Sequence, residues 1–490
     1  MKKKMLCIIM IAVIIVSALS LFACNPRNAY SAEFVVPEGG YDGSEVTIKF
    51  YHTMGEALRT ELDKHIEKFN EMYPNIHIEH TQEGGYDDVR NKIKTELTAG
   101  NQPHIAYCYP DHVALYNVSN AVVQLDNLIA SQITEEHADG SAAEIIGFTQ
   151  EQKDDFIKGY YEEGMQFGDG HMYTLPFSKS TEVLYYNKTF FETNQEYFAG
   201  KGIKTPNQLA KGEYMTWDQM YALCKAVKEK DPTCIPLGYD SEANWFITMC
   251  EQLGSPYTSP EQGNKFLFNN DTNKQFVKEF RKWYQEGLVT TQEIHGGYTS
   301  SLFTAQTGTK SYMSIGSSAG AKHQAPDKVN GEYPFEVGIT TIPQANPENP
   351  KVISQGPSIC IFSKSNPQEV IASWLFVKYL TTSIDFQIQF SEASGYVPPL
   401  KSVMQDEYYL DLLADANGYK DGIAALSAQV CMDQEKTYFT SPAFNGSSMA
   451  RDQVGILMKM ALSTLGANND QIVDTAFQDA LDECQYFFGE

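Results

Sequence analysis

The chain carries little positive charge. Only five arginines occur among its 490 residues, and Lys plus Arg number 37 against 62 Asp plus Glu, which gives a formal net charge of −25. A negative field of this size repels nucleic acid and anionic lipid headgroups, so we expect neither to be a partner. It also disfavours a highly anionic ligand unless a local basic pocket overrides it.

Motifs for disulfides, metals and phosphates are absent from the sequence. The seven cysteines after residue 24 are an odd number with no Cys-x-x-Cys pair, which argues against a disulfide framework or a zinc ribbon. His-Glu-x-x-His is missing, and His77 and His80 stand three apart in a predicted strand, where they point to opposite faces. Neither a P-loop nor a Gly-x-Gly-x-x-Gly motif is present. We therefore expect no metal and no cofactor.

The first 23 residues have the composition of a secretory signal. Three lysines at positions 2–4 precede an apolar run over 5–23, which at 19 residues is at the short end for a transmembrane anchor. The run ends in Leu-Phe-Ala followed by Cys24, which resembles a bacterial lipobox. We expect a lipoprotein signal peptide over 1–23, lipidation of Cys24, and a flexible tether over 24–44 that holds an extracytoplasmic domain off the cell membrane.

Hydrophobic periodicity after residue 45 alternates between strands and helices. Residues 46–51 alternate like a strand, and apolar residues at spacings of three and four then predict a helix that Pro74 ends. A strand over 75–81, a helix ending at Gly100 and a strand over 104–109 follow. Strand–helix–strand units with such short connections imply parallel pairing in an α/β fold. Farther on, Asp169-Gly170 predicts a hairpin.

A second α/β block begins near Val183. The capping box that starts at Thr216 opens a predicted helix to Lys228. Further periodic stretches predict helices over 271–286, 368–381, 423–434, 448–465 and 469–487, and strands over 311–315, 336–342 and 358–362. We therefore predict two α/β lobes, within the two or three domains that this length favours.

One motif fits the nucleophile elbow of a serine hydrolase. The five residues 316–320, Gly-Ser-Ser-Ala-Gly, follow a predicted strand, as an elbow requires. A secreted esterase or other hydrolase that uses Ser318 is therefore the alternative function. However, the only histidine beyond Ser318 is His323, which is too close for a triad histidine, and the residues after it are poor helix formers. We favour a binding role, in which small residues at the tip of a strand let a ligand approach backbone amides.

Polar and aromatic side chains follow several of the predicted strands. His52, Tyr86 and Asp111 come after the first three, and Ser180 stands at the start of the second block. In open parallel sheets the carboxyl ends of the strands converge on the ligand crevice. Carboxylates, hydroxyls and flat rings are the groups that bind a hydroxylated solute, so together these residues predict a crevice for one.

Several segments resemble ABC-transporter extracellular solute-binding proteins of family 1, the carbohydrate-binding type. Their order and spacing agree from about Val46 to the end of the chain. The segments are Tyr-Thr-Leu-Pro-Phe-Ser-Lys-Ser-Thr-Glu-Val-Leu-Tyr-Tyr-Asn-Lys over 173–188, Phe69-Asn70, Tyr-Pro-Asn-Ile over 73–76, Thr216-Trp217, residues 316–320, Gln-Gly-Pro over 355–357 and Ser-Gly-Tyr-Val-Pro over 394–398.

This resemblance implies a two-lobe, periplasmic-binding-protein-like type II fold with a ligand cleft between the lobes. It divides the chain into an N-terminal lobe, 45–180 and 356–405, and a C-terminal lobe, 181–355 and 406–490. It also implies a non-enzymatic, monomeric receptor that delivers its solute to the permease subunits of an ABC importer. A sensory protein that presents the bound solute to a membrane kinase is a further alternative, which the sequence does not separate from an importer receptor.

Ligand contacts can be carried over from the family position by position. Relatives that bind sugars or glycerol 3-phosphate are the most similar. The matching positions are Tyr86, Ser180, Ser317 or Ser318, Gly356, Tyr396 and Trp245, although a core position on an amphipathic helix is the alternative for Trp245.

Two departures from the family pattern concern charge. Pro110 stands where a carboxylate is expected, and the acid is displaced to Asp111. Phe444 stands about where glycerol-3-phosphate binders carry an arginine that grips the phosphate. Together with the negative net charge, this predicts that the ligand is an uncharged mono- or oligosaccharide.

Overall fold

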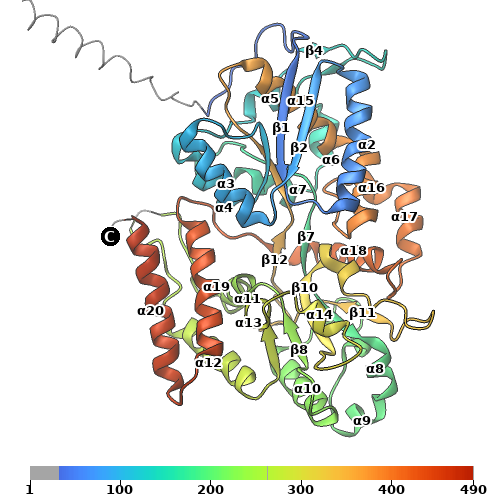
Figure 1. Cartoon of the computed structure of the whole chain (residues 1–490), viewed down its shortest axis with the longest axis vertical. Coiled ribbons are helices and arrows are strands. Elements are labelled where there is room, and N and C mark those ends of the chain that lie inside the picture. Colours follow the sequence, from blue (N-terminus) through green and yellow to red (C-terminus); the bar gives the residue numbers. More distant parts are fainter. Residues whose placement is uncertain (1–31, 262, 489–490) are drawn as a thin grey trace, which may run out of the picture.

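Two lobes, each built on a mixed β-sheet covered by helices, make up the structure, a computed structural model that describes residues 32–261 and 263–488 (Figure 1). The predicted signal peptide and Cys24 lie outside the described residues. None of the helices in the described ranges is both long and apolar enough to cross a membrane.

The sheet of the first lobe has the strand order β2-β1-β3-β13-β6. Its strands are β1 (Val46–His52), β2 (Ile76–Gln82), β3 (Ile105–Cys108), β6 (Leu175–Pro176) and β13 (Ser358–Ile361). Strand β1 pairs in parallel with β2 and β3, which confirms the pairing predicted from the strand–helix–strand pattern. Strand β13 joins from far along the chain and runs antiparallel to both β3 and β6.

Helices cover both faces of this first sheet and enclose its apolar side chains. They are α2 (Glu56–Met72), α3 (Tyr86–Ala99), α4 (Pro110–Tyr116), α5 (Asp126–Ala130), α6 (Gln150–Asp155), α7 (Lys158–Glu162), α15 (Pro367–Thr382), α16 (Ile384–Ser394) and α17 (Glu407–Ala414).

The hairpin predicted at Asp169-Gly170 is wrong. The residues before this turn, Glu163–Met165, form a 3₁₀ helix and offer no strand to pair with. Strand β6 pairs instead with β13. A local turn signal indicates that the chain reverses, but it does not show which strand receives the segment that follows.

The sheet of the second lobe has the order β14-β12-β7-β10-β8-β9, and β11 pairs with β7 beside this path. Its strands are β7 (Ser180–Asn187), β8 (Leu237–Tyr239), β9 (Val289–Thr291), β10 (Met313–Ser317), β11 (Val337–Thr340), β12 (Val352–Gln355) and β14 (Tyr438–Phe439). Strand β8 pairs in parallel with β9 and β10, whereas β7 runs antiparallel to β10, β11 and β12.

The helices of the second lobe include the long pair near the end of the chain, red in Figure 1. They are α8 (Lys188–Thr193), α9 (Gln195–Gly200), α10 (Trp217–Lys230), α11 (Glu242–Leu253), α12 (Asp271–Gln285), α13 (Gln292–His295), α14 (Ser300–Phe303), α18 (Ile423–Asp433), α19 (Ser447–Ser463) and α20 (Asn469–Phe488). Helix α18 has buried residues in the cores of both lobes.

Two neighbouring segments connect the sheets. One runs from β6 to β7 and the other from β12 to β13 through Gly356. Gly356 has a φ of +92°, and a Cβ there would lie 2.5 Å from the carbonyl oxygen of Ser178. Only glycine lets the two connecting backbones approach this closely, because it has no Cβ and tolerates positive φ.

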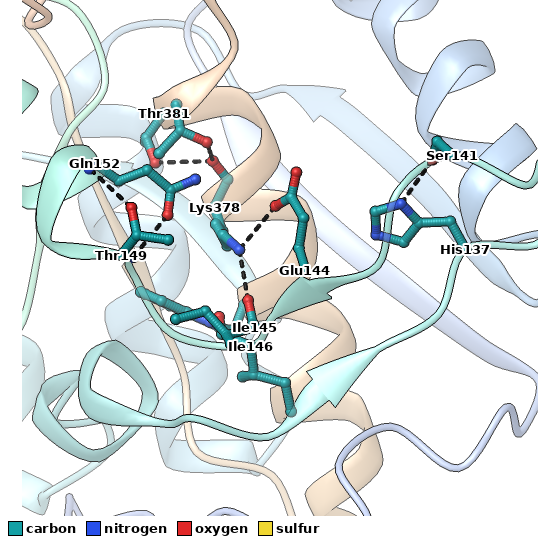
Figure 2. A network of polar contacts seen from close by, with 11 residues as sticks. His137, Ser141, Glu144, Ile145, Ile146, Thr149, Gln152, Lys378 and Thr381 are labelled. Atoms are coloured by element: carbon teal, nitrogen blue, oxygen red, sulfur yellow. Dashed lines mark hydrogen bonds and ion pairs between the residues drawn. The ribbon is translucent and has the colours of Figure 1, made fainter.

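A small two-stranded extension, β4 (Thr134–Glu135) and β5 (Glu144–Ile145), is fastened to α15 in the first lobe. The Lys378 ammonium donates to the Ile145 carbonyl oxygen at 2.6 Å and pairs with Glu144 at 3.0 Å (Figure 2). Thr149 and Gln152 then cap the start of α6 reciprocally. These contacts hold the extension against the core of the lobe.

Residues 32–44 lie against the first lobe. The Ala32 carbonyl accepts a hydrogen bond from the Gln124 amide at 2.7 Å, and the Tyr41 amide donates to Glu135 at 2.8 Å. The composition of residues 24–44 predicts a flexible tether. It gives no sign of these contacts, because backbone hydrogen bonds to distant residues leave no periodic pattern in the sequence. The described part of that stretch is therefore packed onto the domain.

Candidate functional site

A cavity of about 830 Å³ lies between the two lobes. Its first-lobe wall is formed by the N-terminal ends of α3 and α4, and its second-lobe wall by the start of α11 and one side of α19. Strand β12 and residues 440–442 also contribute, next to the segments that connect the sheets. The cavity is therefore placed where movement of one lobe against the other would open or close it.

Tyrosine rings form part of both walls. Tyr86 and Tyr109 in the first lobe stack with their centroids 4.3 Å apart and their planes 26° from parallel. Tyr257 and Tyr298 line the cavity from the second lobe, and Tyr298 is 66% exposed. The buried hydroxyl of Tyr257 has no hydrogen-bond partner among the described residues. Flat rings and an unpartnered hydroxyl suit a ligand with C–H faces and hydroxyl groups.

Carboxylates dominate the charge of the lining. Seven acidic residues contribute to it, against two basic residues, Arg451 and Lys459; the acids are Asp87, Asp88, Asp111, Glu163, Glu242, Glu293 and Asp452. Several of the acids occupy first helical turns, including Asp87 and Asp88 of α3 and Glu242 of α11. The partial positive charge of a helix N-terminus stabilises acids there. Within the described ranges, no group of three or more His, Cys, Asp or Glu is arranged to hold a metal ion.

Arg451 of α19 is one of the two cations of this lining. Its Nη1 donates to Asn244 Oδ1 at 2.5 Å, and its Nε lies 3.6 Å from Oδ2 of Asp111 across the cleft. Its guanidinium carbon is 6.0 Å from the centroid of the Tyr109 ring. Burial acts to lower the pKa of Arg451, but Asp111 and other neighbours outweigh it and raise the pKa above its ordinary value. The guanidinium is therefore charged, and an acid of the opposite lobe lies beside it.

A second ion pair crosses the cleft beside the first. Arg90 of α3 contacts Asp452 of α19 through two nitrogen–oxygen pairs, each at 3.1 Å, and donates to Ser448 at 2.8 Å. Burial raises the pKa of Asp452, and Arg90 opposes that shift. Adjacent residues of α19, Arg451 and Asp452, thus carry opposite charges and pair with opposite charges of the first lobe.

The structure brings Tyr86 and Asp111 of the predicted site together in this lining. Tyr396 is not part of the lining but lies close to Tyr86: burial raises the pKa of Tyr86, and Tyr396 raises it further. Three residues predicted to contact the ligand, Tyr86, Asp111 and Tyr396, therefore lie in or next to the first-lobe wall.

Four more predicted residues lie where the connecting segments meet, outside the lining. Ser180 and Ser317 approach each other with hydroxyl oxygens 3.4 Å apart, and Gly356 packs against the backbone at Ser178. The Ser318 hydroxyl is buried and accepts a hydrogen bond from the Thr181 amide at 3.2 Å. This cluster fixes the junction between the sheets.

The surroundings of Ser318 also differ from those of a nucleophile elbow. The strand before it, β10, is followed by a six-residue 3₁₀ helix, Ser318–His323, and not by an α-helix. Because the hydroxyl is buried and held by the Thr181 amide, it is not presented to solvent.

His52 is buried in the first lobe, outside the cavity lining. Its Nε2 lies 2.9 Å from Nδ1 of His80, and its Nδ1 accepts the Met54 amide proton at 3.1 Å. Burial, followed by the charges of His80 and Arg59, lowers the pKa of His52 to about 3. It is therefore a neutral ring with internal hydrogen bonds.

Trp245 and Phe444 belong to the core of the second lobe. Trp245 is fully buried and stacks on Tyr239, with ring centroids 4.6 Å apart and planes 12° from parallel. Neither residue is part of the cavity lining. Trp245 therefore occupies a core position on α11, which was the alternative to a ligand contact in the sequence analysis.

Sequence reasoning missed Arg451, Tyr257 and Tyr298. One available signal was the scarcity of arginine, because two of the five in the chain, Arg90 and Arg451, mediate the ion pairs across the cleft. The tyrosines carried no comparable signal among 29 of their kind.

The family model of bacterial extracellular solute-binding proteins matches residues 64–414. The chain belongs to this family. Its members are solute receptors and not enzymes, which confirms the predicted absence of catalysis. Among curated relatives, the sn-glycerol-3-phosphate-binding periplasmic protein UgpB of Escherichia coli K12 is 30% identical over 220 residues, or 44% of this chain and 43% of the relative. The chain thus matches less than half the length of that relative.

Solved structures agree with the fold over nearly the whole chain. UgpB of Mycobacterium tuberculosis, in complex with glycerophosphocholine, superimposes with a TM-score of 0.69 at 14% identity, covering 91% of this chain and 100% of that one. The maltose/maltodextrin-binding domain MalE of Bdellovibrio bacteriovorus, bound to maltotriose, gives a TM-score of 0.64 at 16% identity, with coverages of 91% and 100%. These likenesses confirm the predicted two-lobe fold.

Proposed function

We propose that this protein is the extracytoplasmic receptor of an ABC importer and that it binds an uncharged saccharide in the cavity between its lobes. The proposal rests chiefly on one observation: the cavity combines tyrosine rings with two cationic side chains that each already have a carboxylate partner. Arg451 lies beside Asp111, and Lys459 lies 3.3 Å from Glu293. A neutral, hydroxylated ligand can use such groups as donors and acceptors without leaving a buried charge unpaired.

The ligands of similar proteins fall into two classes, phosphate esters and sugars, and the charge of the cavity lining favours a sugar. Proteins similar to this chain are named for sn-glycerol 3-phosphate or are bound to maltotriose or glycerophosphocholine. A phosphate ester would enter a lining with seven acidic residues against two basic ones. Coulomb repulsion in a partly desolvated cleft opposes such a ligand, whereas a sugar incurs no comparable penalty.

The division into lobes 45–180 with 356–405 and 181–355 with 406–490 belongs to the same proposal. The two connecting segments near Ser178 and Gly356 would act as the hinge, and closure on the ligand would present the form that docks on the permease. Two helices after residue 405 depart from this division: α17 packs in the core of the first lobe, and α18 packs in the cores of both lobes.

We also propose that Cys24 carries the lipid that anchors the protein to the membrane, as its position after Leu-Phe-Ala favours. Cys24→Ala should move the protein from the membrane fraction to the soluble fraction. Membrane retention of that variant would contradict the proposal.

A thermal-shift screen against mono- and oligosaccharides tests the ligand class. A ligand that binds only the folded state stabilises it by RT ln(1 + [L]/Kd), about 2.7 kcal/mol at a hundredfold excess over Kd. Tyr86→Ala should abolish the shift, because it removes one ring of the stacked wall. Tyr408→Ala is the matched control, since Tyr408 is 58% exposed and lies outside the cavity lining. If no saccharide shifts the transition, or if a phosphate ester shifts it most, the proposed ligand class is wrong.

A further inference from the structure

Resting on the proposed function, we infer that Asp111 is the specificity-determining residue that makes this cavity reject anionic solutes, because it occupies the guanidinium of Arg451 from across the cleft. The two residues come from different lobes: Asp111 stands in the first turn of α4, and Arg451 in the first turns of α19. Their side chains are 12% and 25% exposed, so the pair is largely shielded from solvent.

The guanidinium is held in place from its own lobe. The 2.5 Å hydrogen bond from Arg451 to Asn244 lies within the second lobe, because Asn244 belongs to α11. Asn244 is 6% exposed and provides a rigid, neutral acceptor. Removing the charge of Asp111 therefore leaves Arg451 positioned in the cavity but without its partner across the cleft.

The charge of Asp111 determines whether a phosphate can bind to Arg451. A phosphate group seeks planar, bidentate contact with a guanidinium, which is the geometry that arginine offers best. Because the Asp111 carboxylate lies 3.6 Å from Nε of Arg451, a phosphate that approaches the guanidinium must displace the carboxylate or bind next to it. Asp111 also acts on the second pair: burial has the largest influence on the pKa values of Arg90 and Asp452, and the charge of Asp111 adds an upward shift to both. Replacing Asp111 by Asn removes one negative charge at the point where the phosphate would bind.

Binding of sn-glycerol 3-phosphate and of inorganic phosphate, measured by calorimetry on the purified chain, tests this inference. We expect the wild-type protein to give no saturable heat with either probe. Asp111→Asn should bind sn-glycerol 3-phosphate at least about tenfold more tightly than the wild type. Adding Arg451→Gln to that variant should remove the gain, because the guanidinium is the group that Asp111→Asn releases.

Glu293→Gln is the matched control. It removes the same charge from the same cavity, but it releases Lys459 instead of Arg451. An equal gain in this variant would show that overall charge, and not Asp111, sets the specificity. Asp111→Ser provides a second test if Asp111→Asn fails to fold, as judged by its thermal transition.

Three results overturn the inference: no gain in folded Asp111→Asn and Asp111→Ser, a gain that survives Arg451→Gln, or an equal gain in Glu293→Gln. The proposed function fails differently, when no saccharide binds the wild-type protein. The phosphate comparison still reports on Asp111 in that case, so the two failures are distinguishable.

Discussion

Replacing Asp452 by Asn should weaken closure of the cleft. Arg90 reaches this carboxylate from α3 through two contacts of 3.1 Å, and Arg90 itself is 8% exposed. Losing a hydrogen-bond partner of a buried charged group costs about 1.5–3 kcal/mol. The Asp452 side chain is 35% exposed, so solvent screening lowers the expected cost to about 1–2 kcal/mol. A change of 1.4 kcal/mol is tenfold in an equilibrium constant, and we expect the closed-to-open ratio to fall by about that factor.

Small-angle scattering of the ligand-free protein measures this change directly, as a larger radius of gyration in Asp452→Asn than in the wild type. Affinity for the saccharide should fall in parallel, because the ligand must then supply the lost closing energy. Asp87→Asn is the matched control. Asp87 lies 3.3 Å from the same Arg90, but on the same helix, so this pair does not cross the cleft.

Equal effects of Asp452→Asn and Asp87→Asn on scattering and affinity would refute the reasoning. The charge-reversed double variant, Arg90→Asp with Asp452→Arg, adds a test of the pair itself, since it should recover part of the closure that either single change loses. Failure of this rescue in a folded double variant would mean that the ion pair is incidental to closure.

Three further predictions concern the second lobe. Trp245→Ala should lower the free energy of unfolding, measured with urea, by about 3–5 kcal/mol, because it empties a core site stacked on Tyr239; a loss below about 1 kcal/mol would contradict that packing. Burial raises the pKa of Glu182 to about 8, so the folded state keeps a proton that the unfolded state loses above its ordinary pKa of 4.5. Stability should therefore fall as pH rises from about 5 to 8, by up to about 1.4 kcal/mol per pH unit, and Glu182→Gln should remove that slope; parallel pH profiles for the two proteins would refute the shift. Arg281→Met should lower the free energy of unfolding by about 1–3 kcal/mol, because Arg281 donates to four carbonyl groups at the end of α19. An unchanged free energy of unfolding would contradict this role.

The fold was largely predictable because its elements have strong local signals. Apolar residues at spacings of three and four locate α2, and Pro74 follows its end as predicted. The parallel pairing of β1 with β2 and β3 follows from connections too short for other arrangements. Strand β6 was beyond local reasoning, since its partner β13 lies far along the chain.

The site was less predictable, because it depends on side-chain directions and on contacts between distant segments. Tyr86 and Asp111 were found because they follow strands whose ends converge, and both line the cavity. Arg451 meets Asp111 only after both lobes have folded, and no spacing in the sequence encodes that contact. Trp245 was predicted as a ligand contact but lies in the core. Helix α11 contributes Asn244 to the cavity lining, whereas its next residue, Trp245, packs in the core of the second lobe. Adjacent helical positions differ by about 100° in direction, so a one-residue difference separates wall from core.

A crystal structure with the saccharide that gives the largest thermal shift would show directly whether the cavity between the lobes binds a sugar. We expect the sugar to lie between the stacked rings of Tyr86 and Tyr109 and the second-lobe wall, within hydrogen-bonding distance of Asp111 or Arg451, with the lobes closed around it. Sugar density outside this cavity, or Arg451 turned away from the sugar to bind a phosphate or another anion, would show that the proposed site is wrong.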